Sequence, residues 1–150
     1  MKFYRVENKP YLKLRSIATI IDYGIFFTIF WFYVDAFGTK QEDGSTTVTG
    51  LLALVIPIFW FLYFVVLEAV NQATPGHDIC KLKVFKPEGY KPSFSDAFKR
   101  RICDPIDIII YGIPAFILIS KTEKHQRLGD ILANTVVAKT SDLIEIGATS

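Results

Sequence analysis

Residues 15–34 read RSIATIIDYGIFFTIFWFYV, and this stretch decides which class of protein the chain belongs to. From residue 16 to residue 34, Asp22 is the only charged side chain. A helix of this length rises about 28 Å, close to the roughly 30 Å thickness of the hydrocarbon core of a bilayer. The stretch therefore predicts a transmembrane helix that begins beside Arg15.

Asp22 is unusual inside such a helix, because a charged group in lipid needs protein, water or a partner beside it. It is a candidate to bind a proton or a cation; alternatively, it forms a hydrogen bond across helices and fixes their packing. Arg15 lies seven positions earlier on the same face, about 10 Å away along the helix axis. We expect each to find a partner on another segment. We interpret Arg15 as a structural partner or a lipid-phosphate contact rather than a substrate ligand.

The composition supports the membrane class. Of the 150 residues, 51% are hydrophobic and 13 are Phe, which is more apolar surface than a soluble domain of this size can bury. The length predicts a single domain, with a core at residues 10–139 and a tail at 140–150. The net charge of +2 gives no reason to expect nucleic acid as a partner.

The sequence contains no recognisable pattern of catalytic or metal-binding residues. Cys80 and Cys103 have neither CxxC spacing nor the density of a disulfide scaffold, and His77 and His125 lack ligand spacing to them. There is no Ser-His-Asp, phosphate-loop or zinc-hydrolase pattern. We therefore expect no enzyme activity, no cofactor and no bound metal.

A second apolar run covers residues 48–67, which are 20 residues without a charge and predict a second transmembrane helix. Pro57 lies inside this run, where its missing N–H is expected to produce a kink. Glu68 follows directly, and we interpret it as a solvated group at the end of the helix.

The third apolar run, residues 106–119, is only 14 residues long, or about 21 Å as a helix. Gly112 and Pro114 interrupt it. We predict a broken or re-entrant hairpin that returns the chain to the side from which it entered. The alternative is a plain third crossing by a helix that includes Asp104 and Asp107.

The basic residues predict the orientation in the membrane. Five Lys or Arg side chains lie in residues 1–15 and seven in residues 69–102, but only one lies in residues 35–47. The positive-inside rule therefore places the N-terminus and residues 69–102 in the cytoplasm, against the lipid bilayer and its anionic head groups. Residues 35–47 are then outside, in a multi-pass protein with a cytoplasmic N-terminus.

Residues 81–86 and 135–139 are short and rich in residues that favour strands. We expect them to pair as a small antiparallel sheet on the cytoplasmic face, because a lone short strand leaves its backbone groups to water. The predicted fold is an all-α membrane protein with two transmembrane helices, a third broken or re-entrant membrane segment and a small cytoplasmic two-stranded β element.

A short amphipathic helix is expected between these strands. Ser93, with Asp96 three positions later, resembles a helix N-cap. Apolar side chains then recur every four residues, opposite Lys99 and Arg100; they are Phe94, Phe98 and Ile102. Such a helix with basic flanks suits the membrane surface.

Two aspartates near the third run are further candidates for a site. Asp104 and Asp107 lie three positions apart, on one face of a helix. They either form an acidic ion-binding site together with Asp22, or they pair with Arg100 and Arg101 as part of the structure.

Asp130 lies outside the apolar runs, next to Gly129. We expect it to hold its segment in place by binding backbone amides or an arginine. Together with Arg127 it should tie the second strand to residues 99–101 or to the two aspartates of the third run.

Several of these features together resemble the RDD family of bacterial membrane proteins, which is named for one arginine and two aspartates. They are Arg15 before a helix, Asp22 within it, TPG at residues 74–76, FKRR at 98–101 and QRLGDILANTVV at 126–137. The resemblance covers residues 10–139 and implies that Arg15, Asp22 and Asp130 are the residues of the family name. It also implies the bacterial cytoplasmic (inner) membrane. This chain departs from the family at His77, where a lysine is usual after the glycine.

The resemblance implies transport of ions or small solutes, with cation/proton exchange among the suggested activities. In the first hypothesis Asp22, with Asp107, alternates between binding a monovalent cation and a proton. In the second, the protein is a non-transporting scaffold or accessory module of a partner complex. Three membrane segments are few for a translocation path, so we expect a homo-oligomer in either case.

Overall fold

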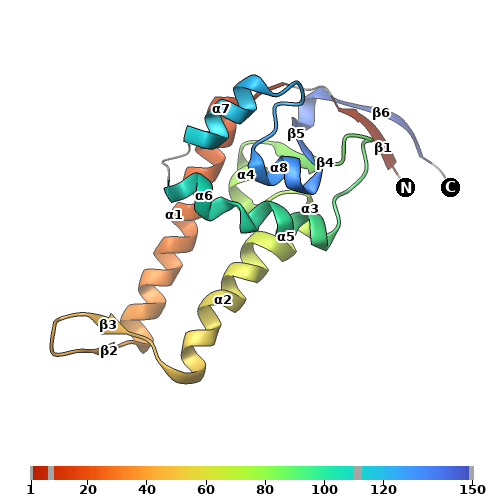
Figure 1. Cartoon of the computed structure of the whole chain (residues 1–150). Helices are drawn as coiled ribbons and strands as arrows, with labels where there is room; N and C mark the ends of the chain where they lie inside the picture. The colour runs from red at the N-terminus through yellow and green to blue at the C-terminus, as the bar shows by residue number, and fades with distance from the viewer. Residues whose placement is uncertain (1, 7–8, 110–112, 149–150) are drawn as a thin grey trace.

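The computed structural model describes residues 2–6, 9–109 and 113–148. Within them, two helical segments are long and apolar enough to cross a membrane, as predicted: α1 (Leu12–Phe37) and Gly50–Asn71. Figure 1 shows both running from a hairpin at one end to a cluster of short helices and strands at the other. The hairpin consists of β2 (Thr39–Lys40) and β3 (Thr46–Thr47).

The second helical segment changes type along its length. It consists of a 3₁₀ turn η1 (Gly50–Leu54), then α2 (Val55–Trp60), a π-helical stretch η2 (Phe61–Val66) and α3 (Leu67–Asn71). Pro57, where we expected a kink, lies directly after the change from 3₁₀ to α geometry. Its missing N–H removes one hydrogen bond that would join these two parts.

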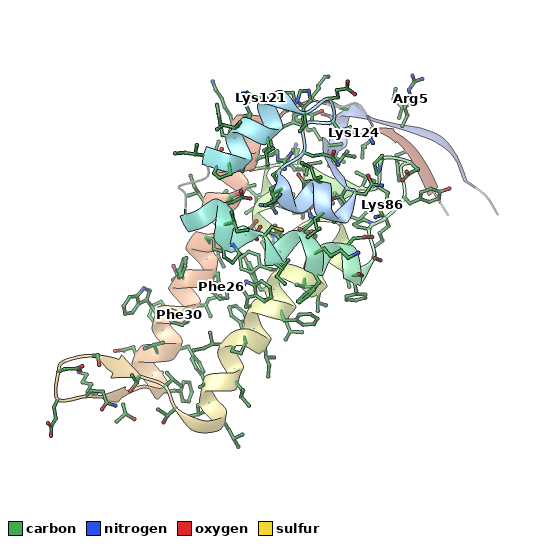
Figure 2. The ribbon with its side chains drawn as sticks, viewed as in Figure 1. Arg5, Phe26, Phe30, Lys86, Lys121 and Lys124 are labelled. Carbon is green, nitrogen blue, oxygen red and sulfur yellow. The ribbon has the colours of Figure 1, made fainter. Side chains whose placement is uncertain are left out.

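Aromatic side chains fill the space between the two long segments. The ring of Phe26 in α1, labelled in Figure 2, stacks on that of Phe59, with centroids 5.4 Å apart. The outward faces are apolar but uncovered: Ile20 is 71% exposed, Phe32 73% and Leu51 84%. Such a surface suits lipid, whereas water would leave it unfavourably solvated.

A two-stranded antiparallel sheet lies in the cluster at the other end. In it, β4 (Leu82–Phe85) pairs with β5 (Val136–Lys139), so that Leu82 faces Lys139 and Phe85 faces Val136. The predicted pairing of these two segments is therefore confirmed. Apolar residues from both strands are buried, and Tyr11 and Leu14 near the start of α1 pack against one side of the sheet.

The amphipathic helix is α5 (Phe94–Ile102), and its cap forms as predicted. The Ser93 hydroxyl accepts the Asp96 N–H at 3.2 Å, and the Asp96 carboxylate accepts the Ser93 N–H at 2.9 Å. The apolar side chains are exposed, as is Lys99; they are Phe94, Phe98 and Ile102. The prediction was wrong for Arg100, which is completely buried because the carboxylate of Glu68 lies inside the protein as its partner.

The third apolar run contains two short helices, α6 (Asp104–Ile109) and α7 (Ile113–Lys121). They have 6 and 9 residues, so they rise only about 9 and 14 Å. Neither can span a bilayer alone. The break that we expected at Gly112 falls in residues 110–112, outside the described residues.

Two remaining short helices and two terminal strands complete the described chain. The helices are α4 (Pro75–Ile79) and α8 (Leu128–Ala133). A 3₁₀ turn, η3 (Thr140–Asp142), leads into β6 (Leu143–Ala148), which pairs with β1 (Lys2–Val6). Residues 140–150, which we assigned only as a tail, carry no clear element signal in the sequence, because a single isolated strand gives a weak signal until its distant partner is known.

Candidate functional site

A buried network of ion pairs lies where α3, α5 and α8 meet α1, and Glu68 is its first carboxylate. Arg100 Nε donates to Glu68 Oε1 at 2.6 Å, and Arg101 Nη2 donates to Glu68 Oε2. Glu68 has no exposed surface. Our interpretation of it as a solvated group was wrong, because the helix that carries it continues to Asn71 and turns this side chain toward α5.

Asp130 is the second carboxylate, and it accepts hydrogen bonds from both Arg15 and Arg100. The backbone N–H of Arg127 also donates to Asp130, at 3.1 Å, and this contact caps α8. Burial alone would raise the pKa of the Asp130 carboxyl, but the charges of Arg100, Arg15 and Arg127 outweigh it and hold this pKa well below its usual range. Asp130 therefore stays ionised and joins α1, α5 and α8.

Gly129 allows this junction to form. A Cβ at this position would lie 3.0 Å from Arg100 Cα and even closer to the Arg100 carbonyl oxygen. Only glycine lets the backbone of α8 come this near to α5. The LGD part of the motif thus combines a close backbone approach with a carboxylate that bridges three elements.

Asp104 is the third carboxylate, and each of its oxygens lies 3.0 Å from an arginine nitrogen. Its Oδ2 accepts hydrogen bonds from Arg101 Nη1 and from the Tyr23 hydroxyl, each at 3.0 Å. Arg127 Nη1 lies 3.0 Å from its Oδ1. Of the two predictions for Asp104, the structure thus contains the ion pair with Arg101.

Asp22 is held by the residues that follow α3. Its Oδ1 accepts the backbone N–H of Gly76 at 2.7 Å, and its Oδ2 accepts the Thr74 hydroxyl at 2.5 Å. His77 Nδ1 lies 3.2 Å from Asp22 Oδ2 and 2.9 Å from Thr74 Oγ1. Since an ionised Asp22 can only accept, and Thr74 already donates to it, Nδ1 of His77 carries a proton in this arrangement.

As expected, Arg15 and Asp22 do not pair with each other, and each has its partners on another segment. The partners of Asp22 were not predicted. The sequence did contain a signal for them: TPG places a turn at the start of a helix, where free backbone N–H groups attract a carboxylate. Burial lowers the pKa of His77, and its hydrogen bond with Asp22 only partly offsets this.

A cavity of about 550 Å³ lies beside α1, between it and the residues of α7. Its buried charged or titratable residues are Arg15, His77, Asp107 and Arg127. The rest of its lining is mostly apolar; it includes Leu12, Ile20, Ile113, Ala115, Phe116 and Ile119, with Ser16 and Thr19. Asp22 is not part of the lining and lies behind His77.

Asp107 differs from the other aspartates. It is only 7% exposed, yet neither carboxylate oxygen has a hydrogen-bond partner among the described residues. The expected pair with Arg100 or Arg101 is not formed, because those guanidinium groups are taken by Glu68, Asp130 and Asp104. The proposed acidic cluster of all three aspartates is also not assembled as one site.

Arg127 has unused donors of its own. Its Nε and Nη2 make no hydrogen bond to any part of the chain that the structure describes, although the side chain is buried. The described residues contain no group of three or more His, Cys, Asp or Glu side chains that could hold a metal ion. The chemistry available in the cavity is therefore that of one carboxylate, two guanidinium groups and one imidazole.

Comparison with curated proteins and with solved structures gave no match. One family model, described as RDD family, matches residues 10–134. The matched span includes both long helical segments, the ion-pair network and every residue that lines the cavity. The chain therefore belongs to the RDD family and is a membrane protein.

Proposed function

We propose that this protein transports a small solute or ion across the membrane, using the cavity beside α1 as its binding site and Asp107 as the group that exchanges a proton for a cation. The observation that carries the proposal is the uncommitted carboxylate of Asp107, buried in a cavity of about 550 Å³. A buried ionisable group without a partner is costly, so its presence favours a functional role.

The geometry favours Asp107 over the other two candidates. Asp22 accepts hydrogen bonds on both oxygens, and Asp104 is bound to two arginines and a tyrosine. A carrier must release its ligand, and these two carboxylates would first have to break several contacts. We therefore assign Asp22 to holding His77 in the cavity wall, and Asp104 to the network.

Charge balance explains how exchange would work. Four arginines in the network face three carboxylates, Glu68, Asp104 and Asp130. An ionised Asp107 supplies a fourth negative charge beside these four arginines, and a proton or a cation on Asp107 cancels it. Binding both at once would place two positive charges on one carboxylate, so the two ligands compete.

Two observations support a cytoplasmic location of the N-terminus and of the β4–β5 sheet. The labelled basic side chains Arg5, Lys86, Lys121 and Lys124 lie at the end of the molecule opposite the β2–β3 hairpin (Figure 2). The pairing of β4 with β5 supports a third membrane segment that returns to the side from which it entered. A re-entrant hairpin of α6 and α7 in the bacterial inner membrane fits both observations.

The test is proton movement across proteoliposomes that contain the full chain. Gradients of Na⁺, of K⁺ or of a solute with an ammonium group would be imposed in turn, with a pH-sensitive dye inside. We expect at least one gradient to drive proton flux, and we expect Asp107→Asn to abolish it.

The matched control is Asp35→Asn, a change of the same kind at an exposed position near the far end of α1. It should leave flux unchanged. Thermal unfolding of each variant checks that folding is intact. Wild-type flux in a folded Asp107→Asn protein would refute Asp107 as the exchanging group, and no flux under any gradient would refute transport.

The second candidate is a non-transporting scaffold, and one observation favours it. Only two candidate spans occur in the described residues, and both expose most of their apolar surface. Two helices cannot enclose a path, so transport requires self-association. A mass measurement in detergent that finds only monomers, together with absent flux, would favour the scaffold.

A further inference from the structure

The cavity beside α1 combines a buried charged interior with an exposed apolar rim. Arg127 is 8% exposed and Asp107 is 7% exposed, and both line the cavity. The apolar residues at the mouth are far more open, with Ile20 at 71%, Ile113 at 54% and Phe116 at 57%. A ligand that fits would place charged groups inside and an apolar body outward, toward lipid.

The two charged residues at the inner part are not joined to each other by a hydrogen bond. Both oxygens of Asp107 lack a donor, and Nε and Nη2 of Arg127 lack a hydrogen-bond acceptor, among the described residues. Both side chains nevertheless line the same cavity. Arg127 forms ion pairs with Asp104 and Asp130, but two of its nitrogens make no hydrogen bond among the described residues. Buried groups of opposite sign with unused hydrogen-bonding atoms in one cavity are complementary to a ligand that brings both a donor and an acceptor.

We propose that this cavity binds a molecule with a primary ammonium group next to an acidic group, on an apolar body. The ammonium would donate to Asp107, and the acidic oxygens would accept from Arg127. This inference rests on the proposed function, because it takes the cavity as the solute site and identifies the cation that Asp107 exchanges for a proton.

The choice of a primary ammonium follows from hydrogen-bond chemistry. A primary ammonium has three N–H donors and can satisfy both oxygens of Asp107, whereas a quaternary ammonium has none. Na⁺ or K⁺ would neutralise Asp107 but would leave the donors of Arg127 unused. A guanidinium prefers carboxylate or phosphate oxygens, which it can contact in pairs.

The size of the cavity agrees with such a ligand. Sites for small molecules usually enclose about 300–1,000 Å³, and this cavity falls inside that range. Two sources carry the required chemistry: the head group of an aminophospholipid, with its acyl chains passing the apolar rim, and a free apolar amino acid. The experiment has one arm for each.

In the lipid arm, the full chain in detergent is mixed with dioleoyl phosphatidylethanolamine or dioleoyl phosphatidylcholine, and retained lipid is counted by native mass spectrometry. The two lipids differ only at the nitrogen, where three methyl groups in phosphatidylcholine replace the N–H donors of phosphatidylethanolamine. In the amino-acid arm, phenylalanine is titrated by calorimetry, with phenethylamine, which lacks the carboxylate, as the comparison. In one arm, we expect phosphatidylethanolamine or phenylalanine to bind at least about tenfold more strongly than its comparison compound. A tenfold difference is the effect of losing one charge-assisted hydrogen bond.

Three variants locate the binding. Asp107→Asn should abolish the preference for the primary ammonium, and Ala115→Phe, which fills the cavity, should abolish binding altogether. Ala36→Phe adds the same ring at an exposed position near the far end of α1 and should change neither. Asp107 has no described partner to lose, so its variant is expected to fold.

The outcomes separate this inference from the transport proposal. Equal retention of both lipids with no phenylalanine binding refutes the inference, as does a preference that survives Asp107→Asn. If Na⁺ or K⁺ gradients drive flux while no zwitterion binds, transport stands and the ligand class is wrong. If a zwitterion binds but nothing drives flux, the ligand class stands and transport is wrong.

Discussion

Asp130→Asn should destabilise the protein more than any other substitution of equal size in the network. Asparagine has nearly the same volume, so no cavity forms and the change isolates the charge. One oxygen remains to accept a hydrogen bond, but the NH₂ group of the new amide faces arginine N–H groups, and both can only donate. Arg15 and Arg100 would lose their shared partner, while both stay buried.

The magnitude follows from the burial of this carboxylate. Removing one member of a buried ion pair typically costs about 3–5 kcal/mol, since the other charge stays without compensation. For a chain of this length, each kcal/mol lowers the unfolding temperature by about 2–4 °C, so we expect a decrease of roughly 6–20 °C. Thermal unfolding in detergent, followed by circular dichroism, measures it.

Two controls make the measurement decisive. Asp35→Asn removes the same charge at an exposed position and should leave the unfolding temperature unchanged. The double variant Arg15→Gln/Asp130→Asn removes one charge of each sign and should be less destabilised than the two single changes added together. If Asp130→Asn unfolds within about 2 °C of the wild type, the charge of Asp130 does not stabilise the fold.

Two further predictions concern the contact between α1 and α4. Burial lowers the pKa of His77, so below about pH 6.5 the unfolded chain takes up a proton that the folded protein resists. The stability of the fold should therefore decrease as the pH drops through this range, and it should decrease less steeply in His77→Asn. Unfolding temperatures measured between pH 5 and pH 8 test this. Gly76→Ala should destabilise by about 1–3 kcal/mol, because its Cβ would lie 2.8 Å from Asp22 Cγ and closer still to the Ala18 carbonyl oxygen. The control is Gly24→Ala, where a Cβ meets nothing within 4 Å and should be neutral or stabilising.

The network shows where reasoning from the sequence succeeds and where it fails. Asp130 follows a glycine in a recognisable motif, and its engagement with backbone and arginine was predictable. Glu68 ends an apolar run, which is equally consistent with solvent and with a buried partner. Only the approach of α5 to α3 decides between them, and that approach depends on packing between segments about 30 residues apart.

The cavity illustrates the same limit. Asp107 was a candidate on its position alone, and the sequence suggested arginine partners six and seven positions away. In the structure those arginines are already engaged, so Asp107 remains available. Competition among several partners for one guanidinium group is a property of the whole arrangement, and no local pattern encodes it.

The sequence by itself determined the membrane class, the two long helical segments, the capped helix and the pairing of β4 with β5. These depend on hydropathy, on length and on interactions between near neighbours or between strands with matching patterns, all of which can be read locally. The tertiary structure alone decided which carboxylate each arginine binds, that His77 supports Asp22, and that Asp107 lines a cavity unpaired. Those outcomes depend on distances between side chains far apart in the chain, which are fixed only when the helices pack.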